Sequence, residues 1–517
     1  MSAIGRGADL RVADVVREYA AQRPERVAVR QGDRALTYAL LDERSNRLAQ
    51  ALRACGVGPD SRVAYLDRSA PEIVELLFAA SKVGAVAVPL NWRLAAPELR
   101  TVLEDSEAPL LVVGREYEQV AQEVVDELSR APTVIRVAAG YEEWLAAHDP
   151  VDPGGRGESG DVVLQLYTSG TTGVPKGVLM THCNLAACAE TSPYWQFDAD
   201  TVSMTPLPMF HIGGIGWAFL GLWNGATTIL VRDFVPEAVL DLLEQERVTN
   251  AIFVPTMLQM LTSVPGAAER DYSALRSIAY GASPITTPVL KAALRTFRCS
   301  LYGVYGLTES TGGVVQLDPE DHDPGGPREH LLRSAGRPLP WVELRVVDSA
   351  TATEVGPHEV GEVWLRAPNV TPGYFNRPTE TAAALTEDGW LRTGDGGYVD
   401  EEGYVFLTDR IKDMIVSGGE NVYPIEVEEA LAQHPDVADV AVIGVPDDRW
   451  VEAVKALVIP RPGAAPTADE LIAFARERLA GYKLPRSVDF VEELPRTPSG
   501  KVLKRELRER YARSVAV

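Results

Sequence analysis

Residues 167–177 bring hydroxyl groups, glycines and one lysine together in a short stretch of the chain. The candidate ligand-binding residues of this stretch are Thr168, Ser169, Gly170, Thr171, Thr172, Gly173 and Lys176. Glycine lets a ligand approach the backbone closely, while backbone N–H groups, hydroxyls and a lysine charge can hold a polyphosphate. A flexible surface loop is the alternative, but the apolar run at 162–166 predicts a buried strand directly before it. We therefore predict a phosphate-binding loop that leaves a strand.

This loop differs from the most common nucleotide loop. The motif G-x-x-x-x-G-K-[ST] requires a hydroxyl residue after the lysine, and here Lys176 is followed by Gly177. The stretch therefore indicates a phosphate loop of another kind.

Residues 301–309 form a second stretch with chemical potential. Tyr305 stands between glycines, so its ring can present a flat face to a nucleotide base. Thr308 and Glu309 add hydroxyl and carboxylate oxygens, which suit Mg²⁺. So short a motif also arises by chance, and its place after the phosphate loop is what favours a nucleotide and magnesium site.

Two further groups complete the candidate chemistry. Asp395 follows a glycine turn, where a carboxylate can accept two hydrogen bonds from a ribose; an ordinary turn acid is the alternative. Lys501 stands in the turn-rich segment 494–502, which predicts an exposed loop tip. A lone lysine near the C-terminus is ordinarily a solvated surface residue.

Residues 205–211 end in His211 and precede a predicted helix with early glycines at 213, 214 and 216. Glycine weakens a helix, so its presence requires a reason. One reason is close packing against a neighbouring element. The other is room for a bulky ligand beside His211, with Trp217 and Trp223 as apolar walls.

In this order, the segments resemble the AMP-forming superfamily of acyl-CoA synthetases, luciferases and peptide-synthetase adenylation domains. The resemblance runs from about residue 10 to residue 510 and is carried by the 167–177 loop, Tyr-Gly-Leu-Thr-Glu, Thr-Gly-Asp, Asp-Arg-Ile-Lys and the Gly-Lys pair at 500–501. Residues 409–424 most resemble fatty-acyl, aryl and coumarate CoA ligases.

The resemblance implies roles for individual residues. The implied ATP and AMP contacts are Thr168, Ser169, Gly170, Thr171, Thr172, Gly173, Lys176, Gly281, Ala282, Ser283, Tyr302, Gly303, Tyr305, Gly306, Asp395 and Arg410. Among them, Tyr305 would lie on adenine, and Asp395 and Arg410 would contact the ribose. The implied catalytic residues are Lys501, Thr308 and Glu309, with Glu309 binding Mg²⁺.

The same resemblance implies an acyl pocket and a coenzyme A site. The acyl pocket would be lined by His211, Gly213, Gly214, Trp217, Gly281, Val304 and Gly306, and the coenzyme A site by Ser417, Gly418, Gly419 and Trp450. Lys412 would be the hinge of a large domain rotation. Val304 and Val451 stand where many relatives carry glycine, which puts the pocket floor and the coenzyme A placement in doubt.

The implied activity is an ATP-dependent carboxylic acid:CoA ligase that uses ATP, Mg²⁺ and coenzyme A. Its acid would be hydrophobic, either medium- to long-chain or bulky alicyclic. An enzyme that loads a carrier protein and a catalytically silent ligand-binding relative are the alternatives. An amino-acid-activating enzyme is disfavoured, because no Asp stands at 210–216 to hold an α-amine.

The implied fold is α/β. A large N-terminal lobe of layered, mostly parallel sheets would span residues 1–408, with a subdomain linker near 150–160. A hinge at 409–412 would lead to a small, mobile α+β domain at 413–517 that carries the catalytic lysine. Periodicity separately predicts helices at 10–20 and 40–55, and a hairpin within 27–38.

Composition limits the partners. The chain has 517 residues, enough for two or more domains, and its net charge of −23 argues against a nucleic-acid partner. Four cysteines without metal or disulfide spacing fit a reducing compartment. With no apolar run of about 18 residues, we expect a cytoplasmic enzyme without integral membrane contact. The sequence leaves open whether the protein forms a homodimer.

Overall fold

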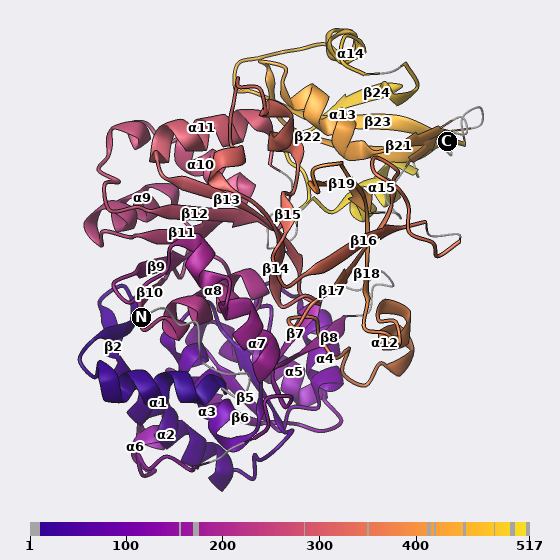
Figure 1. The fold of residues 1–517 in the computed structure, drawn as a ribbon. Coiled ribbons are helices and arrows are strands. Elements are labelled where there is room, and N and C mark those ends of the chain that lie inside the picture. Colours follow the sequence, from indigo (N-terminus) through magenta and orange to yellow (C-terminus); the bar gives the residue numbers. More distant parts are fainter. Residues whose placement is uncertain are drawn as a thin grey trace.

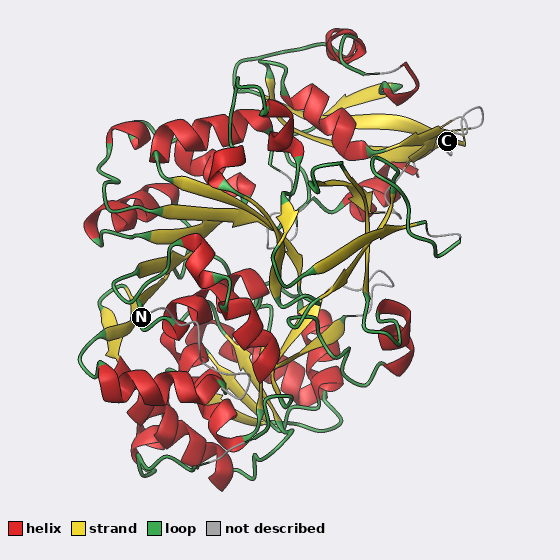
Figure 2. Ribbon diagram, viewed as in Figure 1, coloured by secondary structure: helices red, strands yellow, loops and turns green. Residues whose placement is uncertain are grey.

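The structure, a computed structural model, describes residues 11–154, 157–168, 175–283, 285–348, 351–410, 415–417, 420–447, 451–479, 481–496 and 502–512. It contains two large mixed sheets, one antiparallel sheet and a smaller C-terminal sheet (Figure 1). Helices flank the strands of the large sheets on both sides (Figure 2). The predicted class of layered, mostly parallel sheets with helices is confirmed. No helix within the described ranges has the length and apolar character needed to cross a bilayer.

The first large sheet has nine strands in the order β15-β14-β13-β12-β11-β9-β10-β1-β2. They are β1 (Val27–Gln31), β2 (Arg34–Thr37), β9 (Val202–Thr205), β10 (Thr227–Leu230), β11 (Asn250–Phe253), β12 (Ser277–Gly281), β13 (Ser300–Leu307), β14 (Gly312–Leu317) and β15 (Arg337–Pro338). The central strands from β13 to β1 are parallel, whereas β2, β14 and β15 pair antiparallel at the edges. Its connecting helices are α8 (Ile212–Trp223), α9 (Pro236–Gln245), α10 (Pro255–Thr262) and α11 (Thr287–Phe297). The β1–β2 pair confirms the predicted hairpin.

The second large sheet has six strands in the order β6-β5-β3-β4-β7-β8. They are β3 (Arg62–Leu66), β4 (Val86–Pro89), β5 (Leu110–Val113), β6 (Thr133–Arg136), β7 (Val162–Thr168) and β8 (Lys176–Thr181). The helices around it are α1 (Val12–Gln22), α2 (Tyr38–Ala54), α3 (Pro71–Val83), α4 (Ala96–Ser106), α5 (Glu118–Glu127), α6 (Tyr141–Ala146) and α7 (His182–Ala189). Because β7 and β8 join the sheet of β3–β6, the predicted subdomain linker near 150–160 does not coincide with a boundary between sheets.

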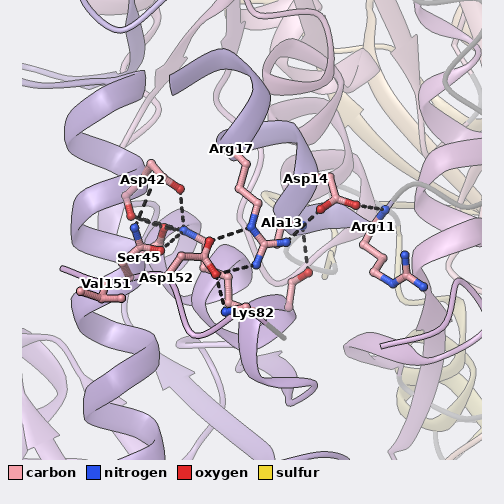
Figure 3. A network of polar contacts seen from close by, with 12 residues as sticks. Arg11, Ala13, Asp14, Arg17, Asp42, Ser45, Lys82, Val151 and Asp152 are labelled. Carbon is pink, nitrogen blue, oxygen red and sulfur yellow. Dashed lines mark hydrogen bonds and ion pairs between the residues drawn. The ribbon is translucent and has the colours of Figure 1, made fainter. Parts of the chain in front are cut away.

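Helix α3 is buried along its whole length, because it packs against α1 and α2 as well as the strands. It carries Lys82, whose side chain has no exposed surface, and a buried charge is costly unless it is paired. The Lys82 ammonium meets Asp42 Oδ1 at 2.6 Å and Ser45 Oγ at 2.7 Å (Figure 3). Beside it, Arg17 donates to both oxygens of Asp152 at 2.7 and 2.9 Å. These contacts join α2 to α3, and α1 to the segment that leads into β7.

The remaining strands form two smaller sheets. The antiparallel sheet contains β16 (Glu343–Val347), β17 (Gly361–Arg366), β18 (Leu391–Val399) and β19 (Val405–Arg410), with α12 (Pro378–Ala384) beside it. The C-terminal sheet contains β20 (Ile415–Ser417), β21 (Glu420–Val422), β22 (Val437–Asp447), β23 (Val451–Pro460) and β24 (Ser487–Phe490). Its helices are α13 (Pro424–Ala432), α14 (Ala468–Arg476) and α15 (Lys504–Ala512). This agrees with a small α+β domain.

The C-terminal elements lie at one end of the molecule, beside α10, α11 and the antiparallel sheet (Figure 1). Thr287 on α11 donates to Glu429 Oε1 on α13 at 2.9 Å, and Gln259 on α10 donates to the Ala438 carbonyl at 3.1 Å. Strand β19 continues to Arg410, inside the predicted hinge at 409–412. The hinge therefore stays a prediction, and Lys412 lies outside the described residues.

Candidate active site

The predicted adenine and ribose residues lie together. Tyr305 on β13 donates its hydroxyl hydrogen to Asp395 Oδ2 on β18 at 2.8 Å. Asp395 follows Gly394, whose φ of +71° makes the turn that glycine favours. The backbone of Asp395 is in register with Arg410 on β19. Three residues far apart in the chain thus converge where the nine-stranded sheet meets the antiparallel sheet.

On strand β13, Tyr302 and Val304 point to the opposite face of the sheet from Tyr305. Successive strand residues point to opposite faces, so Tyr302 and Val304 share one face and Tyr305 the other. Tyr302 is buried and hydrogen-bonds Gln196, and it packs with Val304 in the core of the N-terminal half. Tyr305 instead packs with residues of the antiparallel sheet. The structure therefore does not bring Tyr302 to Tyr305, although both were expected to contact the nucleotide.

Close contacts explain the glycines of this region. A side chain at Gly281 would place its Cβ 2.3 Å from the Val304 carbonyl, and one at Gly306 would lie 2.0 Å from the Gly312 carbonyl. A side chain at Gly303 would meet the Tyr280 hydroxyl at 2.8 Å. These glycines let β12, β13 and β14 lie close together at the site. Their predicted contacts to ligands stay predictions, as do those of Ala282 and Ser283, of which Ala282 has a φ of +69°.

Glu309, the predicted magnesium ligand, meets a residue that sequence reasoning missed. Tyr374 donates its hydroxyl hydrogen to Glu309 Oε1 at 2.9 Å. The Lys176 ammonium lies 5.1 Å from the centroid of the same tyrosine ring. No local motif singles out Tyr374, because its contacts are to residues distant in the chain. The tyrosine joins the magnesium motif to the end of the phosphate loop.

The predicted phosphate loop connects two antiparallel strands. Thr168 ends β7 and is in register with Lys176 at the start of β8, so the two residues face each other across the base of the loop. Residues 169–174, which include Ser169, Gly170, Thr171, Thr172 and Gly173, lie outside the described residues.

His211 directly precedes helix α8, and its ring lies beside the Phe210 ring, with centroids 4.4 Å apart and planes tilted by 50°. Burial, together with the nearby Arg93 charge, lowers the pKa of His211 to about 4, so the ring is neutral at pH 7. Among the described residues, none hydrogen-bonds its buried Nε2 atom. A neutral imidazole with a spare polar atom fits a predicted pocket residue.

Helix α8 supports the packing explanation for one of its glycines. A side chain at Gly214 would place its Cβ 2.2 Å from the Pro208 carbonyl oxygen, whereas one at Gly213 would meet only the Leu207 side chain at 3.0 Å. Trp217 is 2% exposed and stacks on Trp195 with ring centroids 5.3 Å apart. Trp217 is thus part of the core, and its role as a pocket wall stays a prediction.

The predicted coenzyme A and catalytic lysine residues fall mostly outside the described residues. These are Gly418, Gly419, Trp450 and Lys501. Ser417 is described: it is buried on β20 and pairs with Val451 on β23. Its role in coenzyme A binding stays a prediction.

Comparison with known proteins identifies the family to which the chain belongs. The model of the AMP-binding enzyme family matches residues 16–375, and the model of the AMP-binding enzyme C-terminal domain matches residues 426–501. The chain belongs to the AMP-binding enzyme family. As a member of this family it is an AMP-forming ligase, and ligases of this family that act on coenzyme A use ATP, Mg²⁺ and coenzyme A.

The relatives within the AMP-binding enzyme family cover nearly the whole chain. A fatty acid–[acyl-carrier-protein] ligase of Streptomyces coeruleorubidus is 41% identical over 95% of each chain. A feruloyl-CoA synthase of an Amycolatopsis species is 43% identical over 94% of this chain and 96% of its own. The structure of o-succinylbenzoate CoA synthetase from Bacillus subtilis with its acyl-adenylate has a TM-score of 0.85, with 32% identity over 96% of this chain and 97% of that one.

The residues present fit the Mg²⁺ that AMP-binding enzymes use. Within the described parts of the chain, no three His, Cys, Asp or Glu side chains are grouped to hold a metal. Mg²⁺ usually binds through one or two carboxylates together with the phosphates of its substrate and water, rather than in an all-protein cage. One carboxylate on Glu309, with the neighbouring Thr308 hydroxyl, matches that mode of binding.

Proposed function

We propose that the protein is an ATP-dependent ligase that joins a hydrophobic carboxylic acid to the thiol of coenzyme A. The observation that carries the proposal is the convergence of Tyr305 with Asp395, and of Glu309 with Tyr374 and Lys176, at the junction of the sheets. In the proposal Tyr305 would stack on the base, Asp395 would bind the ribose, Glu309 would bind the metal and Lys176 would bind phosphate. A nucleoside triphosphate requires that combination.

In the first step a carboxylate oxygen of the acid attacks the α-phosphorus of ATP. A new P–O bond forms, the bond to the β-phosphate oxygen breaks, and pyrophosphate leaves. Negative charge accumulates on the phosphoryl oxygens while the incoming acid is also anionic. Lys501 would neutralise these oxygens, and Lys176 would hold the departing pyrophosphate. Mg²⁺ held by Glu309 and Thr308 would supply further neutralisation of phosphate charge.

In the second step the sulfur of coenzyme A attacks the acyl carbon of the adenylate. A C–S bond forms, the C–O bond to AMP breaks, the thiol proton is lost, and AMP leaves. Residues 409–412 would act as the hinge that moves Lys501 away and brings Gly418 and Gly419 to the acyl group. Adjacent glycines suit a thin pantetheine arm, because they let it lie close to the backbone.

Several observations support a hydrophobic acid. Helix α8 is buried from Gly214 to Trp223, and neutral His211 adds no charge beside it. The relatives named for fatty acids and for ferulic acid also act on acids with large apolar parts. The proposal covers medium- to long-chain and bulky alicyclic acids.

An acyl carrier protein is a second candidate for the thiol that receives the acyl group. The relative from Streptomyces coeruleorubidus is named for an acyl carrier protein instead of free coenzyme A. Both acceptors present the same pantetheine thiol, so the first step would be identical. Parallel assays with coenzyme A and with a pantetheinylated carrier protein distinguish them.

The test is mass detection of products from ATP, Mg²⁺, coenzyme A and a pool of aliphatic, aromatic and polycyclic acids. We expect a new acyl-CoA and AMP, with the rate of adenylate formation about 100-fold or more lower in Lys501→Ala, because one charge-stabilising group supplies about 3–4 kcal/mol. AMP or acyl-adenylate without a coenzyme A product would favour the carrier-protein acceptor. Absence of products together with absence of ATP binding would indicate a catalytically silent relative and refute the proposal.

A further inference from the structure

Tyr374 contacts two groups of the candidate site at once. Its hydroxyl donates to Glu309 Oε1 at 2.9 Å, and its ring centroid lies 5.1 Å from the Lys176 ammonium. A cation at this distance from an aromatic ring is attracted to the ring face. One side chain therefore sets the spacing between the predicted metal ligand and a predicted phosphate contact.

The backbone around Tyr374 is held from two sides. On one side, the segment pairs with β8: the Leu179 N–H donates to the Gly373 carbonyl at 3.0 Å, and the Phe375 N–H donates to the Gly177 carbonyl at 2.8 Å. On the other side, the Thr371 N–H donates to the Glu309 carbonyl at 2.8 Å. The segment thus bridges the strand after the phosphate loop and the magnesium motif, and it can keep their relative position.

A glycine turn fixes the direction in which Tyr374 points. Gly373 has a φ of +143°, and a Cβ at this position would lie 2.5 Å from Thr381 Cγ2 on α12. The Tyr374 N–H donates to Thr381 Oγ1 at 3.0 Å. Glycine permits this close approach and the hydrogen bond holds the turn against α12, so the tyrosine ring is presented to the site by a constrained backbone.

The hydrogen bond has a consequence for metal binding. It restrains rotation of the Glu309 carboxylate and occupies lone-pair density on Oε1, which favours binding of a cation through Oε2. Groups that hydrogen-bond a metal-binding carboxylate in this way orient it, and their loss typically weakens metal binding by 10- to 100-fold.

We propose that Tyr374 is a positioning residue that orients Glu309 for the divalent cation of the ATP complex and holds Lys176 beside it. This inference rests on the proposed function, because the cation and the triphosphate are those of the adenylation step. Tyr374 touches neither reacting atom in this role. Its effect is exerted through Glu309 and Lys176.

The test is binding of Mn²⁺ as a probe for Mg²⁺, measured on the full-length protein with a non-hydrolysable ATP analogue. In Tyr374→Phe the ring stays and the hydroxyl is lost. We expect the dissociation constant for Mn²⁺ to rise about tenfold, with the affinity for metal-free analogue unchanged. In Tyr374→Leu, where the ring is also lost, the affinity for metal-free analogue should fall as well.

Tyr141→Phe is the matched control. Tyr141 donates to Glu75 Oε2 at 2.8 Å on helix α3, so the same chemical change is made at a tyrosine–glutamate pair of the N-terminal core. Its Mn²⁺ affinity should equal that of the wild type. Equal Mn²⁺ affinity in Tyr374→Phe and wild type would overturn the inference but not the proposed function. The same would follow if Tyr374→Phe lost affinity for the metal-free analogue by as large a factor as it lost affinity for Mn²⁺. A wild-type protein that binds no Mn²⁺ with the analogue would overturn the proposed function and the inference together.

Discussion

At the scale of single residues, burial sets the protonation of three histidines. Burial lowers the pKa of His182, His211 and His322 to about 4 in each case. His182 Nδ1 accepts the Val12 N–H at 3.2 Å, so this nitrogen must be unprotonated. His322 Nδ1 lies 2.7 Å from the Asp318 carbonyl and must carry the hydrogen, which leaves Nε2 to accept the Tyr280 hydroxyl at 2.9 Å. Protonation of His182 would place a hydrogen on Nδ1 and break its contact with the Val12 N–H.

From the low pKa values of these histidines we predict that the free energy of unfolding falls in mild acid. The unfolded chain has a histidine pKa of about 6.5 and binds protons first as the pH drops, whereas the folded chain resists protonation until about pH 4. Stability contributed by a neutral His182 is therefore complete above pH 6.5 and is lost as the pH falls toward 4. The loss between pH 7.5 and 4 should be about 3 kcal/mol for one such residue.

The measurement is chemical unfolding at pH 7.5 and pH 4. His182→Asn keeps an acceptor for the Val12 N–H but removes the titrating ring, so its loss of stability in acid should be smaller than that of the wild type by about 3 kcal/mol. His358→Asn changes a side chain that is 55% exposed and is the control. An acid-induced loss of the same size in His182→Asn and wild type would contradict the explanation.

At the scale of elements, helix α8 shows why glycines can be needed inside a helix. Every residue from Gly214 to Trp223 is buried, so the helix gains stability by packing and not by intrinsic propensity. Its first turn lies against Leu207 and Pro208, which lead into a hydrogen-bonded turn ending at His211. The close approach depends on Gly214, whose neighbour is the rigid Pro208 backbone, far more than on Gly213, whose neighbour is a movable leucine side chain.

This difference predicts opposite effects of two matched substitutions. Gly214→Ala should destabilise the protein by about 2 kcal/mol or more, because the added Cβ at 2.2 Å from a carbonyl oxygen forces the backbone to shift. Gly213→Ala should be neutral or stabilise by up to about 1 kcal/mol, because alanine favours the helix and Leu207 can adjust. Thermal unfolding of both variants is the measurement. Similar unfolding temperatures for the two would show that the helix does not need the glycine for packing.

At the scale of the whole molecule, side-chain hydrogen bonds join the C-terminal elements to α10 and α11 in this arrangement. Those that the structure records between α10 or α11 and the C-terminal elements include Thr287 with Glu429 and Gln259 with the Ala438 carbonyl. Burial raises the pKa of Glu429, while the Thr287 hydrogen bond and Arg333 lower it. A proposed hinge at 409–412 would have to break these contacts when the domain turns.

Thr287→Val should therefore increase the fraction of molecules with the C-terminal domain undocked. The loss of one hydrogen bond, worth about 1 kcal/mol, should raise that fraction about fivefold. The measurement is the rate of limited proteolysis between residues 409 and 414 under conditions that cleave the undocked state. Thr262→Val is the control, because the Thr262 hydroxyl bonds to Leu258 within its own helix. Equal cleavage rates in both variants would mean that Thr287 does not hold the domain.

Much of the fold followed from local features of the sequence. The hairpin at β1–β2, the strand before the 167–177 loop and helices α1 and α2 are set by apolar periodicity and turn residues within a few positions of each other. The pairing of Tyr305 with Asp395 agrees with two motifs that the resemblance placed on one nucleotide. The predictions of these strands and helices held because each depends on neighbouring residues, whereas the nucleotide-binding roles of Tyr305 and Asp395 stay predictions.

Only the tertiary structure decided how distant segments meet. The sequence did not show that Tyr374 joins Glu309 to Lys176, that Tyr302 packs into the core of the N-terminal half, or that β7 and β8 complete the sheet of β3–β6. Each of these depends on strand order and on which face of a strand is buried. Those properties are set by packing between segments far apart in the chain, where no local spacing in the sequence records the contact.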